Sequence, residues 1–112
     1  MVVEDHRDAR EVLVELIESH GHVVDSCADV TTAFARLDHD EFDVLLTDVV
    51  LPDGDAWRLL LELAERGRLP LCVVSMSAYY AAPMRTASAV FGCVGHLSKP
   101  FRMVELEKLL NP

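Results

Sequence analysis

The sequence predicts an α/β domain built around a parallel β-sheet. Three observations support this fold class: the chain has 112 residues, 51% of them are hydrophobic, and short apolar runs alternate with amphipathic stretches along its length. Such alternation is typical of repeated βα units, in which each strand is followed by a helix that packs on the sheet. A chain of this length ordinarily forms one domain, so we expect residues 1–112 to share a single core.

Short apolar runs predict the strands of this sheet. In chain order they occupy Met1–Val3, His22–Val24, Val44–Leu46, Leu71–Val74 and Val94–Leu97. The first run opens the chain and has only three residues before Glu4. A strand this short is expected if translation starts late or if the chain is a trimmed piece of a longer protein.

The first three helices are predicted by apolar spacing and by residues that start or stop a helix. Apolar residues recur at helical spacing between positions 9 and 17, and Gly21 follows where that helix should end. Asp29 is a good N-cap residue for a second helix, and apolar residues at helical spacing follow the turn at Pro52–Asp55.

Two further helices are predicted in the last third of the chain. The stretch Tyr79–Phe91 is rich in alanine and contains Pro83, which a helix tolerates in its first turn. The final helix should run from about Met103 to Leu110. With these two helices, every predicted strand is followed by a helix, as the fold class requires.

The composition excludes several classes of function. Nineteen acidic against ten basic side chains give a net charge of -9, which opposes unaided binding to nucleic acid and favours a cation or a protein partner. No basic and apolar leader opens the chain, and no apolar run approaches the roughly 20 residues that span a bilayer. Cys27, Cys72 and Cys93 lack the spacing of a metal or redox motif, so we interpret them as buried thiols. A cytoplasmic protein without membrane contact is therefore expected.

Polar residues gather where the predicted strands end. Ligands of open parallel sheets bind at the carboxyl ends of the strands, beside the point where the strand order reverses. The residues expected at this edge are three acids, hydroxyl side chains and one ammonium: Glu4, Asp5, Thr47, Asp48, Ser75, Ser77, Ser98 and Lys99. Their joint placement predicts a site.

Each of these residues also has an ordinary structural explanation when it is taken alone. Glu4 and Asp5 could be solvated turn residues or caps of the first helix. Asp48 could be a loop acid, Ser77 a helix N-cap and Lys99 a surface lysine. Only the convergence of all five on one edge of the sheet favours a shared chemical role.

That shared role is predicted to be cation-dependent phosphoryl chemistry. Carboxylates held within a few ångströms repel one another unless a cation neutralises them, and oxygen ligands with room for water suit Mg2+ better than Ca2+. Lys99 and the Ser77 hydroxyl would complete a site for a tetrahedral anion. Asp48 would then be the nucleophile that forms an acyl phosphate.

Four segments resemble the response-regulator receiver domain of two-component signalling. They are VVED at 2–5, LLTDVVLPDGD at 45–55, VVSMSA at 73–78 and FGCVGHLSKPF at 91–101, and they cover essentially the whole chain in the right order. The resemblance implies a flavodoxin-like, doubly wound sheet of five parallel strands in the order 2-1-3-4-5, with helices on both faces.

The resemblance also implies a set of ligands and contacts. Mg2+ would be held by Asp5, Asp48 and the backbone carbonyl of Val50, while Glu4 would act through a metal-bound water. The phosphoryl group on Asp48 would be contacted by two further residues, Ser77 and Lys99. Such a domain is not an enzyme beyond its own phosphorylation and dephosphorylation.

The partners implied by the resemblance are proteins. The donor would be a phosphohistidine on a histidine kinase or on a histidine phosphotransfer domain, and the downstream protein is unknown. We expect the signal to leave by the face that joins the predicted helix within Tyr79–Phe91, the strand Val94–Leu97 and the helix Met103–Leu110. The same face could support a homodimer.

The chain departs from the family pattern at three positions. His96 stands at the switch position, where the family usually has Tyr or Phe, so the usual coupling of this ring to Ser77 should be weaker. Ala56 replaces a common glycine and could alter the loop before the third helix. Glu4 stands where aspartate is also frequent, but its side chain should still reach a metal-bound water.

Other functions fit the sequence less well. A calcium loop with Gly54 at its sixth position would need ligands at Val49 and Leu60, which cannot coordinate. A phosphatase with an aspartate nucleophile would want a second acid at Val50. The serious alternative is a receiver-fold interaction module that docks a partner without phosphorylation. Three aromatic residues next to the expected site could serve packing or a partner contact: Trp57, Tyr79 and Tyr80.

Overall fold

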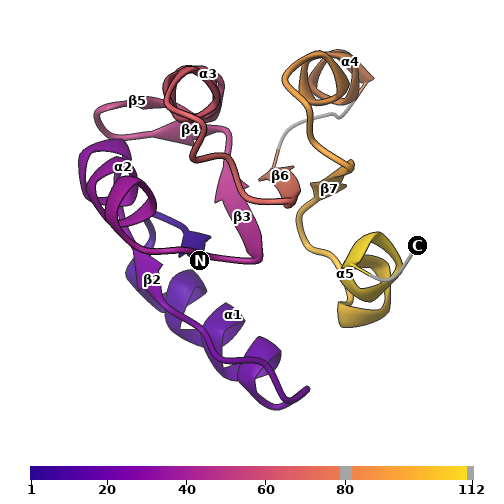
Figure 1. Ribbon diagram of the computed structural model, residues 1–112. Coiled ribbons are helices and arrows are strands. Elements are labelled where there is room, and N and C mark those ends of the chain that lie inside the picture. Colours follow the sequence, from indigo (N-terminus) through magenta and orange to yellow (C-terminus); the bar gives the residue numbers. More distant parts are fainter. Residues whose placement is uncertain (79–81, 111–112) are drawn as a thin grey trace.

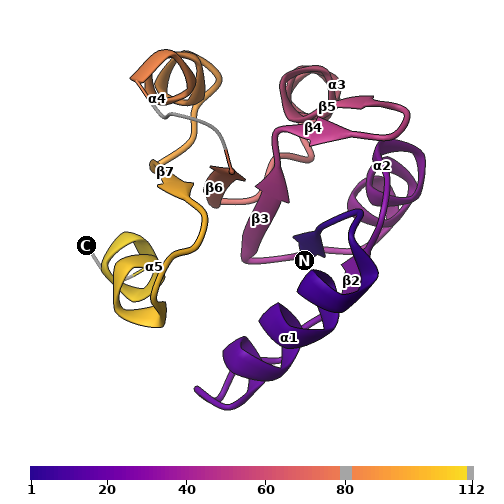
Figure 2. The same cartoon turned by 180° about the vertical axis from the view of Figure 1, so that it is seen from behind.

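The computed structural model describes residues 1–78 and 82–110. Its main sheet has five parallel strands in the order β2-β1-β3-β6-β7, and helices cover both faces (Figure 1; Figure 2). This confirms the predicted flavodoxin-like order and the short first strand. The strands are β1 Val2–Val3, β2 Ser26–Cys27, β3 Val44–Asp48, β6 Cys72–Ser77 and β7 Gly95–Ser98.

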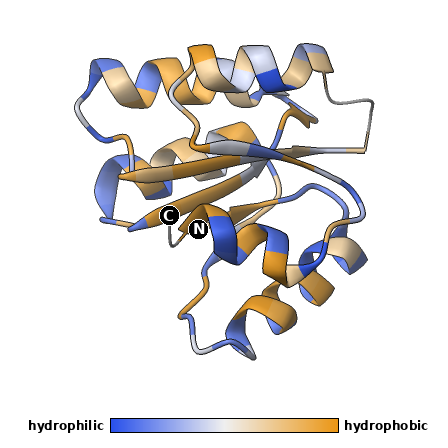
Figure 3. Ribbon diagram, turned by 90° about the vertical axis from the view of Figure 1, so that its right-hand side faces the viewer, coloured by the Kyte–Doolittle hydropathy of each residue, from blue (hydrophilic) through white to orange (hydrophobic). Residues whose placement is uncertain are grey.

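The helices divide between the two faces of the sheet. The chain contains α1 Arg7–Glu18, α2 Val30–His39, α3 Ala56–Glu65, α4 Ala82–Val90 and α5 Met103–Leu110. One core cluster joins the sheet to α2 and α3, and the other joins it to α1 and α5. Neighbouring strand residues alternate between the clusters, as Leu45 and Leu46 do. Figure 3 shows the resulting hydrophobic strands between helices with polar outer faces.

The second strand begins four residues further along the chain than predicted. The prediction of a strand at His22–Val24 is wrong, because β2 is Ser26–Cys27. The register pairs Val2 with Ser26, which places the run 22–24 before the amino end of β1. Residues 22–24 therefore precede the paired part of β2, and the Val23 side chain is fully exposed.

A small antiparallel hairpin, not predicted from the sequence, follows β3. Its strands are β4 Val50–Leu51 and β5 Gly54–Asp55. The turn residue Asp53 accepts hydrogen bonds from the backbone N–H groups of Val30 and Thr31 at 2.8 and 3.0 Å, and from the Thr31 hydroxyl at 2.6 Å. The Thr31 hydroxyl, followed by these backbone donors, lowers the pKa of Asp53 to about 2. The hairpin is thereby fastened to the start of α2.

The start of α2 agrees with the predicted cap Asp29, and α3 begins at a second aspartate cap, Asp55, which was predicted only as a turn residue. The Asp29 side chain accepts from the Thr32 N–H at 2.7 Å, and the Asp55 side chain accepts from the Arg58 N–H at 2.9 Å. Pro83 lies in the first turn of α4, as expected. The predicted start of this helix at Tyr79 lies outside the described residues.

Replacing Asp29 with alanine is expected to destabilise the fold by about 1 kcal/mol, since it removes the acceptor at the first turn of α2. Asp29→Asn keeps an acceptor oxygen and should lower the free energy of unfolding by only a few tenths of a kcal/mol. It is therefore the matched control. Urea unfolding of the three proteins measures the difference. Equal midpoints for the alanine variant and the parent would show that the cap contributes nothing.

Two further expectations concerned the burial of the three cysteines and the lack of a membrane-spanning segment. All three cysteines are free; Cys27 is buried, whereas Cys72 and Cys93 are only half-buried. The interpretation as buried thiols therefore holds fully for Cys27 alone. Among the described residues, no helix has the length and apolar character needed to cross a bilayer.

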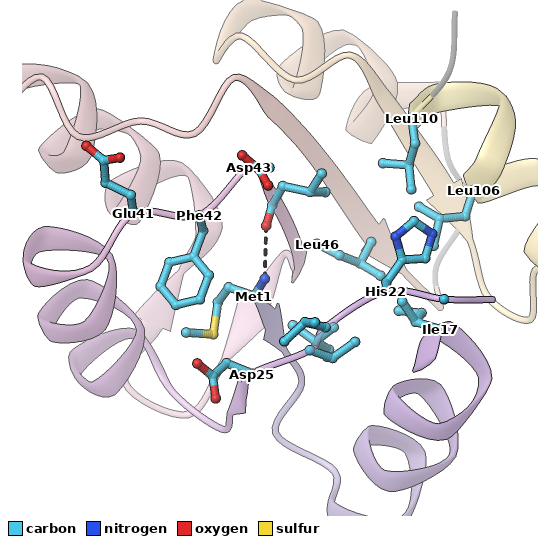
Figure 4. Close-up of a pocket in the computed structure, with 15 residues that line it drawn as sticks. Met1, Ile17, His22, Asp25, Glu41, Phe42, Asp43, Leu46, Leu106 and Leu110 are labelled. Carbon is cyan, nitrogen blue, oxygen red and sulfur yellow. Dashed lines mark hydrogen bonds between the residues drawn. The ribbon is translucent and has the colours of Figure 1, made fainter. Parts of the chain in front are cut away.

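A cavity of about 460 Å³ lies at the amino ends of the central strands (Figure 4). Met1, Phe42 and Leu106 are among its lining residues, and the Met1 ammonium donates to the Val44 carbonyl oxygen at 2.9 Å. Burial lowers the pKa of this amino group. None of the predicted site residues lines the cavity. The site must therefore be sought at the opposite ends of the strands.

Candidate functional site

The sheet register brings the predicted residues to one edge. Asp48 and Ser77 are the last residues of β3 and β6, and Lys99 directly follows β7. Glu4 and Asp5 follow β1, whose Val3 pairs with Thr47. Because parallel strands end at the same edge, these five side chains converge there, as the sequence predicted.

Three carboxyl groups form the centre of the site. Glu4, Asp5 and Asp48 each offer a carboxylate oxygen within 4.8 Å of the others. Glu4 and Asp48 are buried, with 3% and 6% of their surfaces exposed, whereas Asp5 is exposed. The backbone N–H of His6 donates to Glu4 Oε2 at 3.2 Å and helps to hold it. A set of oxygen ligands that is open on one side fits a hard cation.

Lys99 supplies the positive charge beside these acids. Its Nζ lies 2.5 Å from Asp48 Oδ1 and also forms an ion pair with Glu4. The Lys99 backbone N–H donates to the Ser77 carbonyl oxygen at 2.8 Å. This backbone bond holds Lys99 beside the end of β6, so the Lys99 and Ser77 side chains start from neighbouring positions at the edge of the sheet.

One ammonium cannot neutralise two buried carboxylates. Burial, assisted by Glu4, raises the pKa of Asp48 to about 7, although Lys99 opposes the rise. Burial would also raise the pKa of Glu4, but hydrogen bonds with Asp48, Lys99 and His6 lower it to about 2. Asp48 therefore holds a proton over much of the acidic range. Its carboxylate becomes available near neutral pH or when a second cation enters.

A row of hydroxyl groups and one imidazole lies beside the acids. His96 Nδ1 is 2.6 Å from Ser75 Oγ, and His96 Nε2 is 3.1 Å from Ser77 Oγ. Ser75 Oγ also lies 2.8 Å from the hydroxyl of Ser88, a buried residue of α4. The predicted switch pair, Ser77 and His96, is thus in direct contact.

Sequence reasoning missed the roles of Ser75 and Ser88. Ser75 lies two positions before Ser77 on the same strand face and pairs with His96 in the register, a signal that the strand period contains. Ser88 comes from a helix, and its contact depends on how that helix packs. No sequence pattern indicated it.

Two other residues that the sequence analysis singled out, Val50 and Trp57, lie near the acids in the sequence or in the fold. Val50 lies in β4, two residues after Asp48, and the N–H of Ala56 donates to the Val49 carbonyl at 2.8 Å rather than to that of Val50. Trp57 stacks on Phe91 with ring centroids 5.3 Å apart, which supports a packing role. The expected contribution of Tyr79 and Tyr80 lies outside the described residues.

Known proteins are similar to this chain in sequence. The chain is 33% identical over 106 residues to the transcriptional regulatory protein TcrA of Mycobacterium tuberculosis, covering 95% of this chain and 42% of TcrA. It is 31% identical over 117 residues to the response regulator receiver protein CpdR of Brucella abortus, covering 98% of this chain and 94% of CpdR. The chain thus spans less than half of the first relative and nearly all of the second.

A solved structure and a family model agree with these relatives. The receiver domain of the sensor histidine kinase PA1611 of Pseudomonas aeruginosa, solved with a magnesium ion in its active site cleft, superposes with a TM-score of 0.83 at 27% identity, covering 97% of this chain and 90% of that one. Residues 1–111 match the model of the response regulator receiver domain. From its strand order, its acidic strand ends and this match, the chain belongs to the response regulator receiver domain family.

Proposed function

We propose that this chain is a phosphorelay receiver that takes a phosphoryl group onto Asp48 from a phosphohistidine. The observation that carries the proposal is the surroundings of Asp48, a buried strand-end carboxylate with an ammonium 2.5 Å away and two further carboxylates within 4.8 Å. The donor would be a histidine kinase or a histidine phosphotransfer domain.

The transfer needs positioning and charge neutralisation more than it needs other chemistry. An Asp48 oxygen attacks phosphorus, an O–P bond forms, and the N–P bond to the donor imidazole breaks. The electron pair of that bond stays on the imidazole nitrogen, which is then protonated. Lys99 neutralises phosphoryl oxygens, and the Ser77 hydroxyl donates a hydrogen bond to one of them. Later attack by water would release phosphate.

The carboxyl cluster fits Mg2+ by its donor atoms. Asp5 and Asp48 would bind directly, with the Val50 carbonyl as a third ligand and Glu4 acting through a water. When bound, Mg2+ neutralises carboxylate and phosphoryl charge. The magnesium ion of the P. aeruginosa receiver domain supports this assignment, as do the raised pKa of Asp48 and the open side of the cluster.

Intact mass after incubation with acetyl phosphate tests the proposal. We expect one added phosphoryl group in the presence of Mg2+ and none after EDTA. A chain that stays unmodified while it still binds a receiver partner would instead support an interaction module that acts without phosphorylation.

The proposed partners are proteins, and the proposed location is the cytoplasm. The net charge of -9 argues against direct contact with nucleic acid, even though TcrA is named a transcriptional regulatory protein. The signal would leave by the face of α4, β7 and α5 to a downstream protein or a second copy of the chain. The domain would catalyse nothing beyond its own phosphorylation and dephosphorylation.

Asp5→Ala is expected to weaken Mg2+ binding by at least about tenfold, because it removes a ligand from the exposed side of the cluster. The fold should survive, since Asp5 is exposed. Calorimetric titration with Mg2+ measures the loss, and Asp8→Ala, which removes an exposed acid of α1, is the control. Equal affinities of parent and Asp5→Ala would remove Asp5 from the ligand set.

A further inference from the structure

Asp53 caps helix α2 from another part of the chain. The backbone N–H groups in the first turn of a helix have no partner inside the helix. Asp53 accepts hydrogen bonds from those of Val30 and Thr31, at 2.8 and 3.0 Å. Asp29 accepts from that of Thr32, at 2.7 Å. The Thr31 hydroxyl also donates to Asp53, at 2.6 Å, so three hydrogen bonds join the turn of the β4–β5 hairpin to the start of α2.

The start of α2 is a firm support for this turn. Leu37 of α2 is buried in the core, with 1% of its surface exposed. The positive end of the helix dipole favours a carboxylate at the first turn, and hydrogen bonds, that of the Thr31 hydroxyl first, lower the pKa of Asp53 to about 2. A side chain at Gly54 would place its Cβ 3.4 Å from the Val30 side chain. The hairpin and the start of α2 are thus in contact, and they lie side by side in Figure 1.

The hairpin register turns the Val50 carbonyl away from the partner strand. Val50 lies opposite Asp55, and the Ala56 N–H donates to the Val49 carbonyl oxygen at 2.8 Å. In an antiparallel ladder, a hydrogen bond that flanks a residue pair in this way marks the pair as the non-hydrogen-bonded type. The N–H and carbonyl groups of such a pair point out of the ladder. The Val50 carbonyl is therefore left for the role of third Mg2+ ligand.

A short turn transmits the position of Asp53 to Val50. The turn consists of Pro52 and Asp53, and Leu51 pairs with Gly54 across it. Mg2+ demands near-octahedral geometry, so a carbonyl that moves freely must be ordered at an entropic cost when the ion binds. The bonds of Asp53 restrict that motion before the ion binds.

We propose that Asp53 is a positioning residue, which holds the hairpin against α2 so that the Val50 carbonyl is placed to bind Mg2+. The inference rests on the proposed function and adds to the cation site a residue outside its acidic cluster. Among the described residues, the clustered carboxylates are those of Glu4, Asp5 and Asp48. Asp53 therefore acts through the backbone of the hairpin.

Two simpler effects of Asp53 must be separated from positioning. Removing Asp53 deletes a negative charge, which by itself weakens the binding of a cation, and it also deletes a helix cap. Thr31→Val isolates the first effect, because it keeps the Asp53 charge and the shape of the side chain while it removes the hydroxyl. Thr31→Ser restores the hydroxyl. Asp29→Ala isolates the second effect, because it removes a cap bond from the same helix end and leaves the bonds to the hairpin in place.

Calorimetric titration of these variants with Mg2+ tests the proposal. Asp53→Ala should bind Mg2+ about tenfold more weakly than the parent, the lower end of the range for residues that orient metal ligands, because it loosens one ligand of several. Thr31→Val loses one of the three bonds and should bind about two- to threefold more weakly. Thr31→Ser and Asp29→Ala should bind like the parent.

Hydrogen exchange without Mg2+ gives a second readout. The Ala56 N–H closes the hairpin by its bond to the Val49 carbonyl, so its exchange reports how firmly the hairpin is held. In EDTA, Asp53→Ala should speed this exchange, whereas Asp29→Ala should leave it unchanged. Mg2+ should restore much of the protection in Asp53→Ala, because coupling between the ion and the hairpin must act in both directions.

Each alternative outcome is decisive. Equal Mg2+ affinities of Thr31→Val and Thr31→Ser reduce the role of Asp53 to its charge, and equal losses in Asp53→Ala and Asp29→Ala reduce it to a helix cap. Unchanged exchange of the Ala56 N–H in Asp53→Ala shows that the hairpin is held without it. Any of these results overturns the positioning role and leaves the phosphorelay assignment standing, whereas a parent that binds no Mg2+ overturns both.

Discussion

Asp48→Asn should abolish phosphoryl acceptance by this chain. An amide lacks the nucleophilic oxygen that forms the acyl phosphate, and the neighbouring acids cannot replace it. Glu4 is buried and held by Lys99 and by the His6 N–H, while Asp5 is exposed on the open side of the cluster. Intact mass after incubation with acetyl phosphate and Mg2+ should show no adduct.

The matched control is Asp43→Asn, which changes an exposed acid just before the amino end of the same strand. This variant should be labelled like the parent. Undiminished labelling of Asp48→Asn would move the acceptor to another residue. Peptide mapping of the labelled protein would then locate it.

Lys99→Met should destabilise the fold by about 3 kcal/mol near pH 8, the lower end of the range for breaking a buried ion pair. The substitution keeps most of the side-chain length but leaves Glu4 and Asp48 together without a cation. The lower end is appropriate because about a quarter of the Lys99 side chain is exposed. Chemical unfolding without Mg2+ measures the loss, and Lys108→Met, on the exposed face of α5, is the control.

The loss should depend on pH in a definite direction. Asp48 has a pKa of about 7 in the folded parent against an ordinary 3.8. The folded state therefore keeps a proton that the unfolded state releases, and stability falls as the pH rises through this interval. Glu4 acts oppositely: its pKa of about 2, against an ordinary 4.5, contributes stability that is present above 4.5 and lost only as the pH falls towards 2.

Without Lys99, the pKa of Glu4 should rise and the penalty for ionising both acids should grow. The deficit of Lys99→Met should thus be greatest at pH 8 and shrink towards pH 5. The double variant Asp48→Asn, Lys99→Met should recover most of the loss, because only one buried carboxylate remains. A deficit that is independent of pH and unrelieved by Asp48→Asn would mean that Lys99 stabilises through packing alone.

The parts of the fold that local chemistry decides were predictable. Asp29 caps α2 through a bond to a backbone group three residues away, so its role was visible in the sequence. The position of β2 was not, because it depends on register with β1 rather than on apolar composition. The β4–β5 hairpin was missed as well, since strands of two residues carry no periodicity.

The candidate site was likewise predictable only in part. The convergence of Glu4, Asp5, Asp48, Ser77 and Lys99 follows from the rule that parallel strands end at one edge, and it was predicted. The sharing of Lys99 between two acids was not, because it depends on side-chain paths within the folded site. The contact of Ser75 with Ser88 likewise needs the packing of α4.

The hydrogen bonds of Asp53 give the two halves of the site different freedom to evolve. They tie the hairpin after Asp48 to the start of α2, far along the chain from α4 and β7. The backbone that would present the Val50 carbonyl is thereby preorganised independently of the surface that we propose carries the signal. Substitutions around His96 and α4 would then leave the shape of the half that we propose binds the cation unchanged. Related domains could therefore change their protein partners while the residues of the acidic site stay the same.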